Sequence, residues 1–301
     1  MATSSHIAVV DCHHHLWDPG ENPTYPWLLD AWAAGAPPDG RPPCTYSTAD
    51  YLRDMRSVNL VASIHVEAGW MGSDPCGETT WLAGQIASTG WPSAAIAYAD
   101  LAADNVEAVL AWQSEFGFVR GIRMRLAEHH RSLLALGIGD NPMVDPRWRN
   151  GFSRLARHQF SFELQVAPRI MPDAAALADA FPDTTIIVSH LGFPMDRSPE
   201  GLAYWRNALG ELARRENIMV KLSGLSMMGL WPSARDVSTV IDHAVNVFGP
   251  SRVMFGTNFP IDLKNLSPKA HLQRHVDIVQ KFSTDEAGSM LHLNAVRAYR
   301  L

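Results

Sequence analysis

The sequence predicts a (β/α)8 barrel, and two observations support this fold class. Eight short apolar segments typical of strands alternate with amphipathic, helix-like segments along 301 residues. The first strand candidate ends in DCHHHLWDP, without the glycine-rich turn that an open doubly wound sheet usually carries there. The barrel is therefore favoured over the open sheet, and we expect a single domain spanning residues 1–301.

The strand candidates and the helix starts can be placed on the sequence. The strands are predicted at residues 6–12, 60–68, 93–101, 119–126, 160–168, 184–192, 218–225 and 252–260. Helix-start signals lie at Ser47, at Asp145 before a proline and at Ser198 before a proline. Long segments at 16–47 and 127–142 are expected to overhang the mouth of the barrel, as lids, as substrate walls or as loops packed on their own aromatic residues.

Composition excludes several classes of function. The formal net charge is -6 with no long basic run, which argues against nucleic acid as a partner. No apolar segment approaches the ~20 residues of a membrane span, and the N-terminus lacks the pattern of a secretion signal. The three cysteines fit neither a zinc site nor a disulfide framework. We therefore predict a cytoplasmic protein whose partner is a small molecule, with a homo-oligomer left open.

Strand alternation predicts which side chains face the barrel interior. The inward faces of strands 4, 5 and 7 are predicted to be polar, with Arg123, Arg125, Ser161, Glu163, Gln165, Lys221 and Ser223. On strand 2, Ser63, His65 and Glu67 are predicted to face inward and Ala62, Ile64 and Val66 outward. On strand 1, Val9, Asp11, His13 and His15 share one face. Because buried charges are costly unless they are paired or used, this interior indicates a site at the mouth.

Three histidines give the strongest chemical signal. His13 and His15 are two residues apart at a strand end, so both imidazoles can bind one divalent ion. His190, at the end of strand 6, can supply a third nitrogen, whereas His14 points to the opposite face. His65 fits a core position as well as it fits a site.

The segments DCHHHLWDP, DPCGETTWL, VSHLGFP, KLSGL and FGTNFPID resemble signatures of the amidohydrolase superfamily, and more narrowly of its amidohydrolase-2 group. That group contains sugar-lactone and dicarboxylate-lactone hydrolases and some decarboxylases. The resemblance implies that His13, His15 and His190 act as metal ligands or as polarisers of a carbonyl group. It also identifies two departures: Asn258 stands where the family has an aspartate ligand and base, and Gln165 replaces a histidine. One zinc or manganese ion and metal-free catalysis therefore both stay open.

Other residues complete the predicted site. Asp262 is expected to replace the missing base or to position water through Asn258; its alternative is a cap or a partner for a cation. Arg123 can anchor a carboxylate, or can instead pair with Glu67 in a buried network. Four further residues are predicted to bind substrate, and for Trp17 packing under a loop is the alternative: Glu67, Gln165, Lys221 and Trp17.

The predicted function is a lactonase that opens a small lactone. Whether that lactone carries an acidic group is left open. A metal-dependent decarboxylase is the nearest alternative, although it typically needs the strand-8 aspartate that is absent here. A non-catalytic binding member of the family is the third, because two family ligands are missing. The retained His13, His15, His190 and Lys221 argue against that last alternative.

Overall fold

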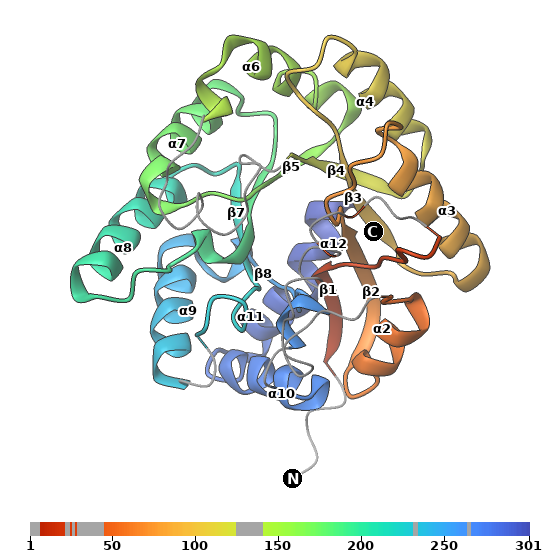
Figure 1. The fold of residues 1–301 in the computed structure, drawn as a ribbon. Helices are drawn as coiled ribbons and strands as arrows, with labels where there is room; N and C mark the ends of the chain where they lie inside the picture. The colour runs from red at the N-terminus through yellow and green to blue at the C-terminus, as the bar shows by residue number, and fades with distance from the viewer. Residues whose placement is uncertain are drawn as a thin grey trace.

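Eight parallel strands lie side by side in chain order, β1 to β8, with helices between them in a computed structural model of the chain (Figure 1). The structure describes residues 7–21, 25, 28, 45–124, 141–230, 234–263 and 266–301. The order excludes the open doubly wound sheet, in which the strand order reverses. The barrel prediction is confirmed. No helix in these described ranges is long and apolar enough to cross a membrane.

The strands and helices follow the predicted pattern, with shorter strands than expected. The strands are β1 Ala8–His14, β2 Asn59–Val66, β3 Ala94–Tyr98, β4 Val119–Arg123, β5 Ser161–Leu164, β6 Ile186–Val188, β7 Ile218–Leu222 and β8 Val253–Phe255. The helices are α2 Thr48–Met55, α3 Gly77–Thr89, α4 Val106–Glu115, α6 Pro146–Phe152, α7 Met171–Ala180, α8 Pro199–Ala213, α9 Ala234–Phe248, α10 Pro268–Val279, α11 Thr284–Gly288 and α12 Asn294–Tyr299.

The predicted helix-start residues act as N-caps. The side chains of Ser47, Asp145 and Ser198 each accept a hydrogen bond from a backbone N–H of the first turn, in α2, α6 and α8. In α2 the Asp50 carboxylate also accepts from the Ser47 N–H, which completes a capping box. The start signals read from the sequence are therefore confirmed.

The barrel closes between β1 and β8 through side chains as well as backbone. The Asn258 N–H donates to the His13 carbonyl at 2.7 Å, and the His15 N–H donates to the Phe259 carbonyl at 2.8 Å. Below them the Asp11 carboxylate accepts from the Thr257 N–H at 2.8 Å and from the Thr257 hydroxyl at 2.6 Å. The Asp11 side chain thus joins β1 to the segment after β8 below the two backbone hydrogen bonds.

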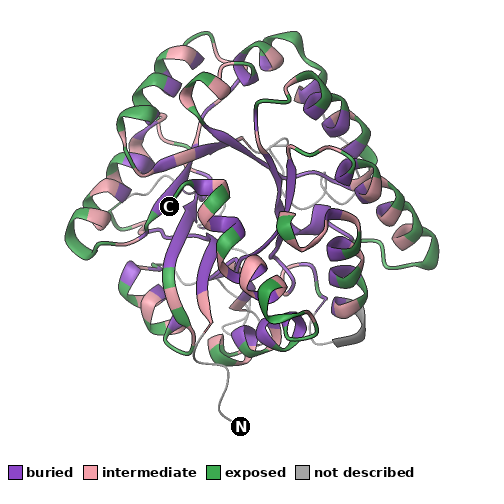
Figure 2. Cartoon of the chain, turned by 180° about the vertical axis from the view of Figure 1, so that it is seen from behind, coloured by how far each residue is buried: buried purple, intermediate pink, exposed green. Residues whose placement is uncertain are grey.

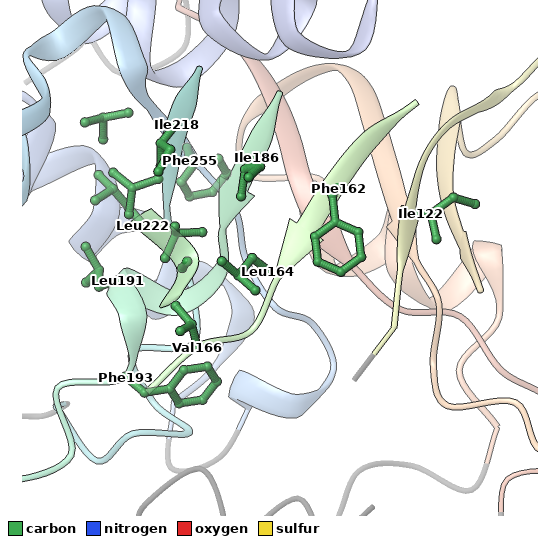
Figure 3. Packing of buried hydrophobic residues seen from close by; sticks show 14 of the residues in the cluster. Ile122, Phe162, Leu164, Val166, Ile186, Leu191, Phe193, Ile218, Leu222 and Phe255 are labelled. Atoms are coloured by element: carbon green, nitrogen blue, oxygen red, sulfur yellow. The ribbon is translucent and has the colours of Figure 1, made fainter. Parts of the chain in front are cut away.

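The larger core lies between the strands and the surrounding helices. The outward residues of β4 to β8 are apolar and buried, and Figure 3 shows several of them packed together, among them Ile122, Phe162, Leu164, Ile186, Ile218 and Phe255. Figure 2 shows the burial of the strands and of the inner faces of the helices. Burial at roughly 25 cal/mol per Å² of apolar surface makes this layer the main source of stability.

A second apolar cluster fills the lower interior of the barrel, and it corrects the predicted faces of strands 1 and 2. Its members come from β1 to β3, from β6 to β8 and from α12: Val10, Cys12, Ala62, Ile64, Val66, Ala94, Ile96, Ile187, Met219, Met254, Ala295 and Tyr299. Ala62, Ile64 and Val66 therefore face inward, and the expectation that they face outward is wrong. The polar interior is confined to the upper layers.

A register shift in β1 explains the error on that strand. Asp11 pairs with Ser63 and His14 pairs with His65, so β1 has one residue more than β2 over this stretch. Such a bulge puts Cys12 and His13 opposite a single residue of β2. Val9 and Asp11 face the helices, because Val9 joins the outer core and Asp11 accepts a hydrogen bond from Tyr51 of α2. The predicted shared face of Val9, Asp11 and His13 is therefore wrong.

Candidate active site

His13 lies at the centre of the site and is fully buried. Its ring centroid is 4.6 Å from that of His190 and 5.1 Å from that of His15. Neither ring nitrogen has a hydrogen-bond partner among the described residues. Burial, and then the charges of Lys221, His190, His15 and Arg123, hold the pKa of His13 well below its usual range. A neutral, buried imidazole without partners is costly for stability, which indicates a chemical use.

His15 is held in one tautomer by the backbone. Its Nδ1 lies 2.7 Å from the Val66 carbonyl oxygen, which can only accept, so Nδ1 carries the proton. Nε2 is therefore the bare nitrogen and can accept a proton or a metal ion. Burial, followed by the nearby Arg123 charge, lowers the pKa of His15 well below its usual range. His15 is thus neutral at pH 7 and can act as a base.

His190 is positioned by the segment that follows β7. Its Nδ1 is 2.9 Å from the Ser223 hydroxyl. A β-carbon on the next residue, Gly224, would lie 2.6 Å from the same nitrogen, so only glycine leaves room for the ring. His190 itself has a φ of 54°, and this left-handed backbone turns it out of β6. The KLSGL segment therefore orients the third histidine.

The three histidines are the candidate ligands for a metal ion. Among the described residues, no three His, Cys, Asp or Glu side chains are arranged so that they could hold one ion. The unpartnered nitrogens of His13 are nevertheless suited to a ligand. The described histidines do not form a ready three-ligand site, and His13, His15 and His190 as metal ligands stay a prediction.

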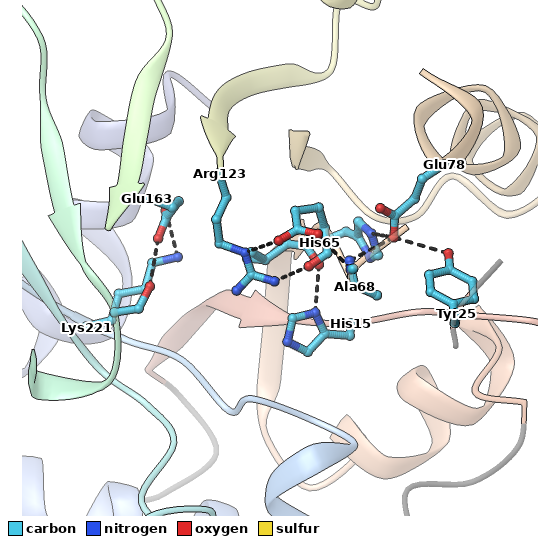
Figure 4. A network of polar contacts seen from close by, with 12 residues as sticks. His15, Tyr25, His65, Ala68, Glu78, Arg123, Glu163 and Lys221 are labelled. Carbon is cyan, nitrogen blue, oxygen red and sulfur yellow. Dashed lines mark hydrogen bonds and ion pairs between the residues drawn. The ribbon is translucent and has the colours of Figure 1, made fainter. Parts of the chain in front are cut away.

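Arg123 is paired, as the buried-network alternative predicted. Its Nε donates to the Glu67 carboxylate at 2.6 Å and its Nη2 donates to the Glu67 carbonyl oxygen. Glu67 also accepts from the Gly69 N–H at 2.6 Å. Figure 4 shows Arg123 and its dashed contacts above His15. These bonds use Nε and Nη2 of Arg123, so Nη1 can donate to a substrate oxygen, while Glu67 balances the charge.

Lys221 lies beneath the histidines in an ion pair with Glu163, which is also drawn in Figure 4. The Lys221 Nζ is 2.8 Å from Glu163 Oε1 and donates to the Cys12 carbonyl at 2.6 Å. Glu163 also accepts from Tyr299 at 2.6 Å and from Ser189 at 3.3 Å. These contacts make Lys221 a support for the strand that carries His13, and its contact with substrate stays a prediction.

Asn258 and Asp262, at the end of β8, are bonded to each other. The Asn258 Nδ2 donates to Asp262 Oδ1 at 2.9 Å. Asp262 is fully buried and also accepts from the backbone N–H groups of Ser226 and Met227, at 2.9 and 3.0 Å. The carboxylate therefore fixes the loop after β7 and orients the amide of Asn258. These bonds fit the prediction that Asp262 positions a water molecule through Asn258. The other predicted role, Asp262 as the base, stays a prediction.

Replacing Asp262 by Asn separates these two roles. The new amide group would face at least one backbone N–H, so we expect a loss of about 1–3 kcal/mol in unfolding free energy. We expect kcat to fall because Asn258 loses the carboxylate that orients its amide, and both limbs of the pH–rate profile to remain if His15 is the base. Urea unfolding and the profile measure these effects, with exposed Asp104→Asn as the control. Loss of one limb would instead identify Asp262 as the base.

The remaining predicted residues divide into two groups. Trp17 is fully buried, its ring lies 6.2 Å from that of His15, and its backbone forms a bridge with Tyr46, so it is a packed side chain and its contact with substrate stays a prediction. Gln165, just after β5, has a buried Oε1 without a hydrogen-bond partner in the described part of the chain. Arg125 and almost all of the predicted mouth loops 16–47 and 127–142 lie outside the described residues, apart from residues 16–21, 25, 28, 45–47, 141 and 142.

His65 and Asp11 were not placed correctly from the sequence. His65 accepts from the Leu16 N–H at Nδ1, and its Nε2 is 3.3 Å from Glu78 of α3, so it faces the helices. Asp11 supports His13 by accepting from its N–H at 3.2 Å. Burial raises the pKa of Asp11 to about 6, against the lowering effect of its hydrogen bonds with Thr257, His13 and Tyr51. The sequence did carry one signal for this role of Asp11, namely an aspartate two residues before His13.

Comparison with known proteins identifies the family. The model of the amidohydrolase family matches residues 10–301. The chain belongs to this family. It is 35% identical to protein y4mH of Sinorhizobium fredii, over 99% of this chain and 100% of that one. It is 29% identical to an L-fucono-1,5-lactonase of Burkholderia multivorans, over 84% of this chain and 82% of the relative.

Solved structures agree with the family assignment. An amidohydrolase from Burkholderia multivorans, solved with bound HEPES and also with bound zinc, has a TM-score of 0.80 in both crystal forms. The sequence identities are 26% and 25%, and each comparison covers 98% of this chain and 99% of the other. Together with the family match, these likenesses show that the chain is a hydrolase of the amidohydrolase type.

Proposed function

We propose that this amidohydrolase opens a small, hydroxylated, uncharged lactone at the mouth of the barrel. The observation that carries the proposal is the His13, His15 and His190 cluster, in which the central His13 has no hydrogen-bond partner within the described ranges. Lactone opening needs a polarised carbonyl, an activated water and donors for the oxyanion. The Nε2 of His15 takes the proton of the attacking water and gives it to the ring oxygen as the C–O bond breaks, while His13 and His190 orient the water and the carbonyl.

The charge balance of the site supports an uncharged substrate. Glu67 compensates Arg123 and Glu163 compensates Lys221, while the lowered pKa values of His13 and His15 keep both rings neutral. A dicarboxylate lactone would bring negative charge to a region where the described cations are already paired. The Arg123 Nη1 and the Asn258 amide suit hydroxyl and carbonyl oxygens instead. This narrows the predicted substrate and agrees with the L-fucono-1,5-lactonase relatives.

A panel of lactones tests the proposal. Neutral sugar lactones such as L-fucono-1,5-lactone are compared with a dicarboxylate lactone, by acid release in a pH-indicator assay. We expect a higher kcat/KM for the neutral substrates. The panel is repeated after chelation with the metal content measured, and full activity at sub-stoichiometric metal would rule out the metal-dependent version. Failure to open any lactone would contradict the proposed function.

A further inference from the structure

Glu78, in the first turn of α3, is a buried carboxylate on which three hydrogen bonds converge. Its Oε1 accepts from the Ala68 N–H at 2.9 Å, from the Tyr25 hydroxyl at 3.2 Å and from Nε2 of His65 at 3.3 Å. Figure 4 draws these contacts, which bring α3, the end of β2 and the segment after β1 to one oxygen atom. Burying a carboxylate is costly unless it is paired or used, and the catalytic steps proposed above give Glu78 no role.

The contact with His65 leads to His15. The Leu16 N–H donates to Nδ1 of His65 at 3.1 Å, so that nitrogen is bare and Nε2 carries the proton that points to Glu78. Glu78 therefore fixes the tautomer and the plane of the His65 ring. Leu16 directly follows His15, whose own Nδ1 is bonded to the Val66 carbonyl oxygen. Because two neighbouring residues of β2 hold His15 and the residue after it, a rotation of His65 would displace the base.

The contact with Ala68 leads to Arg123 through a single peptide plane. The N–H of this plane belongs to Ala68 and donates to Glu78. Its carbonyl belongs to Glu67 and accepts from Nη2 of Arg123. Because a peptide unit is planar and rigid, its N–H and its carbonyl can only turn together. Glu78 therefore also fixes the direction of the carbonyl group that holds the guanidinium.

We propose that Glu78 is a positioning residue that holds His15 and Arg123 in their working geometry without touching the substrate. This inference rests on the proposed function, in which His15 is the base and Arg123 donates to a substrate oxygen. The third donor, Tyr25, comes from the segment after β1 and joins that segment to the same oxygen atom. One carboxylate thus sets both the group that activates water and a group that binds the lactone.

Glu78→Gln tests this role at a temperature where circular dichroism shows the variant to be fully folded. The new amide oxygen is a neutral acceptor, so the three hydrogen bonds lose the strength that the charge gives them. We expect kcat/KM on the best lactone to fall about tenfold or more, with a lower kcat and a higher KM, because both His15 and Arg123 are displaced. A merely structural role would leave both constants of the folded enzyme at their wild-type values.

Amide hydrogen exchange gives a second readout that needs no turnover. The N–H groups of Leu16 and Ala68 should exchange about tenfold faster in Glu78→Gln, because their bonds to His65 and to residue 78 open more often. Glu107→Gln is the matched control. Glu107 is likewise the second residue of its helix, α4, but its side chain is 44% exposed and pairs with Arg154 at the surface. This control should change neither the kinetic constants nor the two exchange rates.

The two readouts separate this inference from the proposed function. Wild-type kcat and KM in the folded Glu78→Gln variant, or unchanged exchange at Leu16 and Ala68, would overturn the role of Glu78. If the wild type opens no lactone, the proposed function fails. The exchange rates then decide on their own whether Glu78 holds the two segments that carry His15 and Glu67.

Discussion

Replacing His13 by Gln is expected to lower kcat by about 10²–10⁴-fold while the protein stays folded. The imidazole contacts His15 and His190 at ring distances of 5.1 and 4.6 Å, but neither of its nitrogens bonds to any residue that the structure describes. Its loss therefore removes a group from the chemistry without leaving a protein donor or acceptor unpaired. Steady-state kinetics with the best lactone of the panel, beside urea unfolding, measure both effects. His190→Gln should reduce turnover in the same way.

The neighbouring His14 provides a matched control for His13. It stacks on Tyr51 at 3.9 Å and lies 3.0 Å from the Ser63 hydroxyl, on the helix side of β1. His14→Gln should therefore lower stability and leave kcat close to that of the wild type. If His13→Gln keeps full turnover, the cluster is not the catalytic centre. If His14→Gln instead loses turnover, the bulge assignment in β1 is wrong.

The fold was predictable because it depends on patterns that repeat along the chain. All eight strands were found by their apolar runs, and Ser47, Asp145 and Ser198 were found by the chemistry of helix caps. Strands 5 and 7 alternate cleanly, so Glu163 and Lys221 were correctly placed inside the barrel. The predicted strand ends extended too far, because apolar residues continue into the loops.

The details of the site were harder to predict, because they depend on events that alternation does not encode. One extra residue in β1 moved His13 to the inner face beside Cys12 and left Asp11 outside. On β2, His65 was taken as an interior residue because it is polar, yet Glu78 of α3 satisfies it in the helix layer. The partner of Glu163 was also unpredictable, since Arg123 and Lys221 were both inward cations. Only the structure distinguishes them.

The Lys221–Glu163 pair gives the second large expected effect. Lys221→Met should destabilise the protein by about 3–5 kcal/mol, because it leaves the Glu163 carboxylate buried without its cation. Both side chains are fully buried, so water cannot replace the lost partner. The double variant Lys221→Met/Glu163→Gln should recover much of this loss, since it removes both charges together. Unfolding free energies from urea titration of the single and double variants measure the difference.

The surface pair Arg147–Asp104 supplies the control for this result. Its two groups are 2.8 Å apart, as close as Lys221 and Glu163, but their side chains are 67% and 97% exposed. Arg147→Met should therefore cost no more than about 1 kcal/mol, because water solvates the remaining carboxylate. If the double variant is as unstable as Lys221→Met alone, packing against Tyr299 and not charge burial explains the loss. In that case the lysine is held in the barrel by its contacts with the C-terminal helix, and the ion pair is secondary.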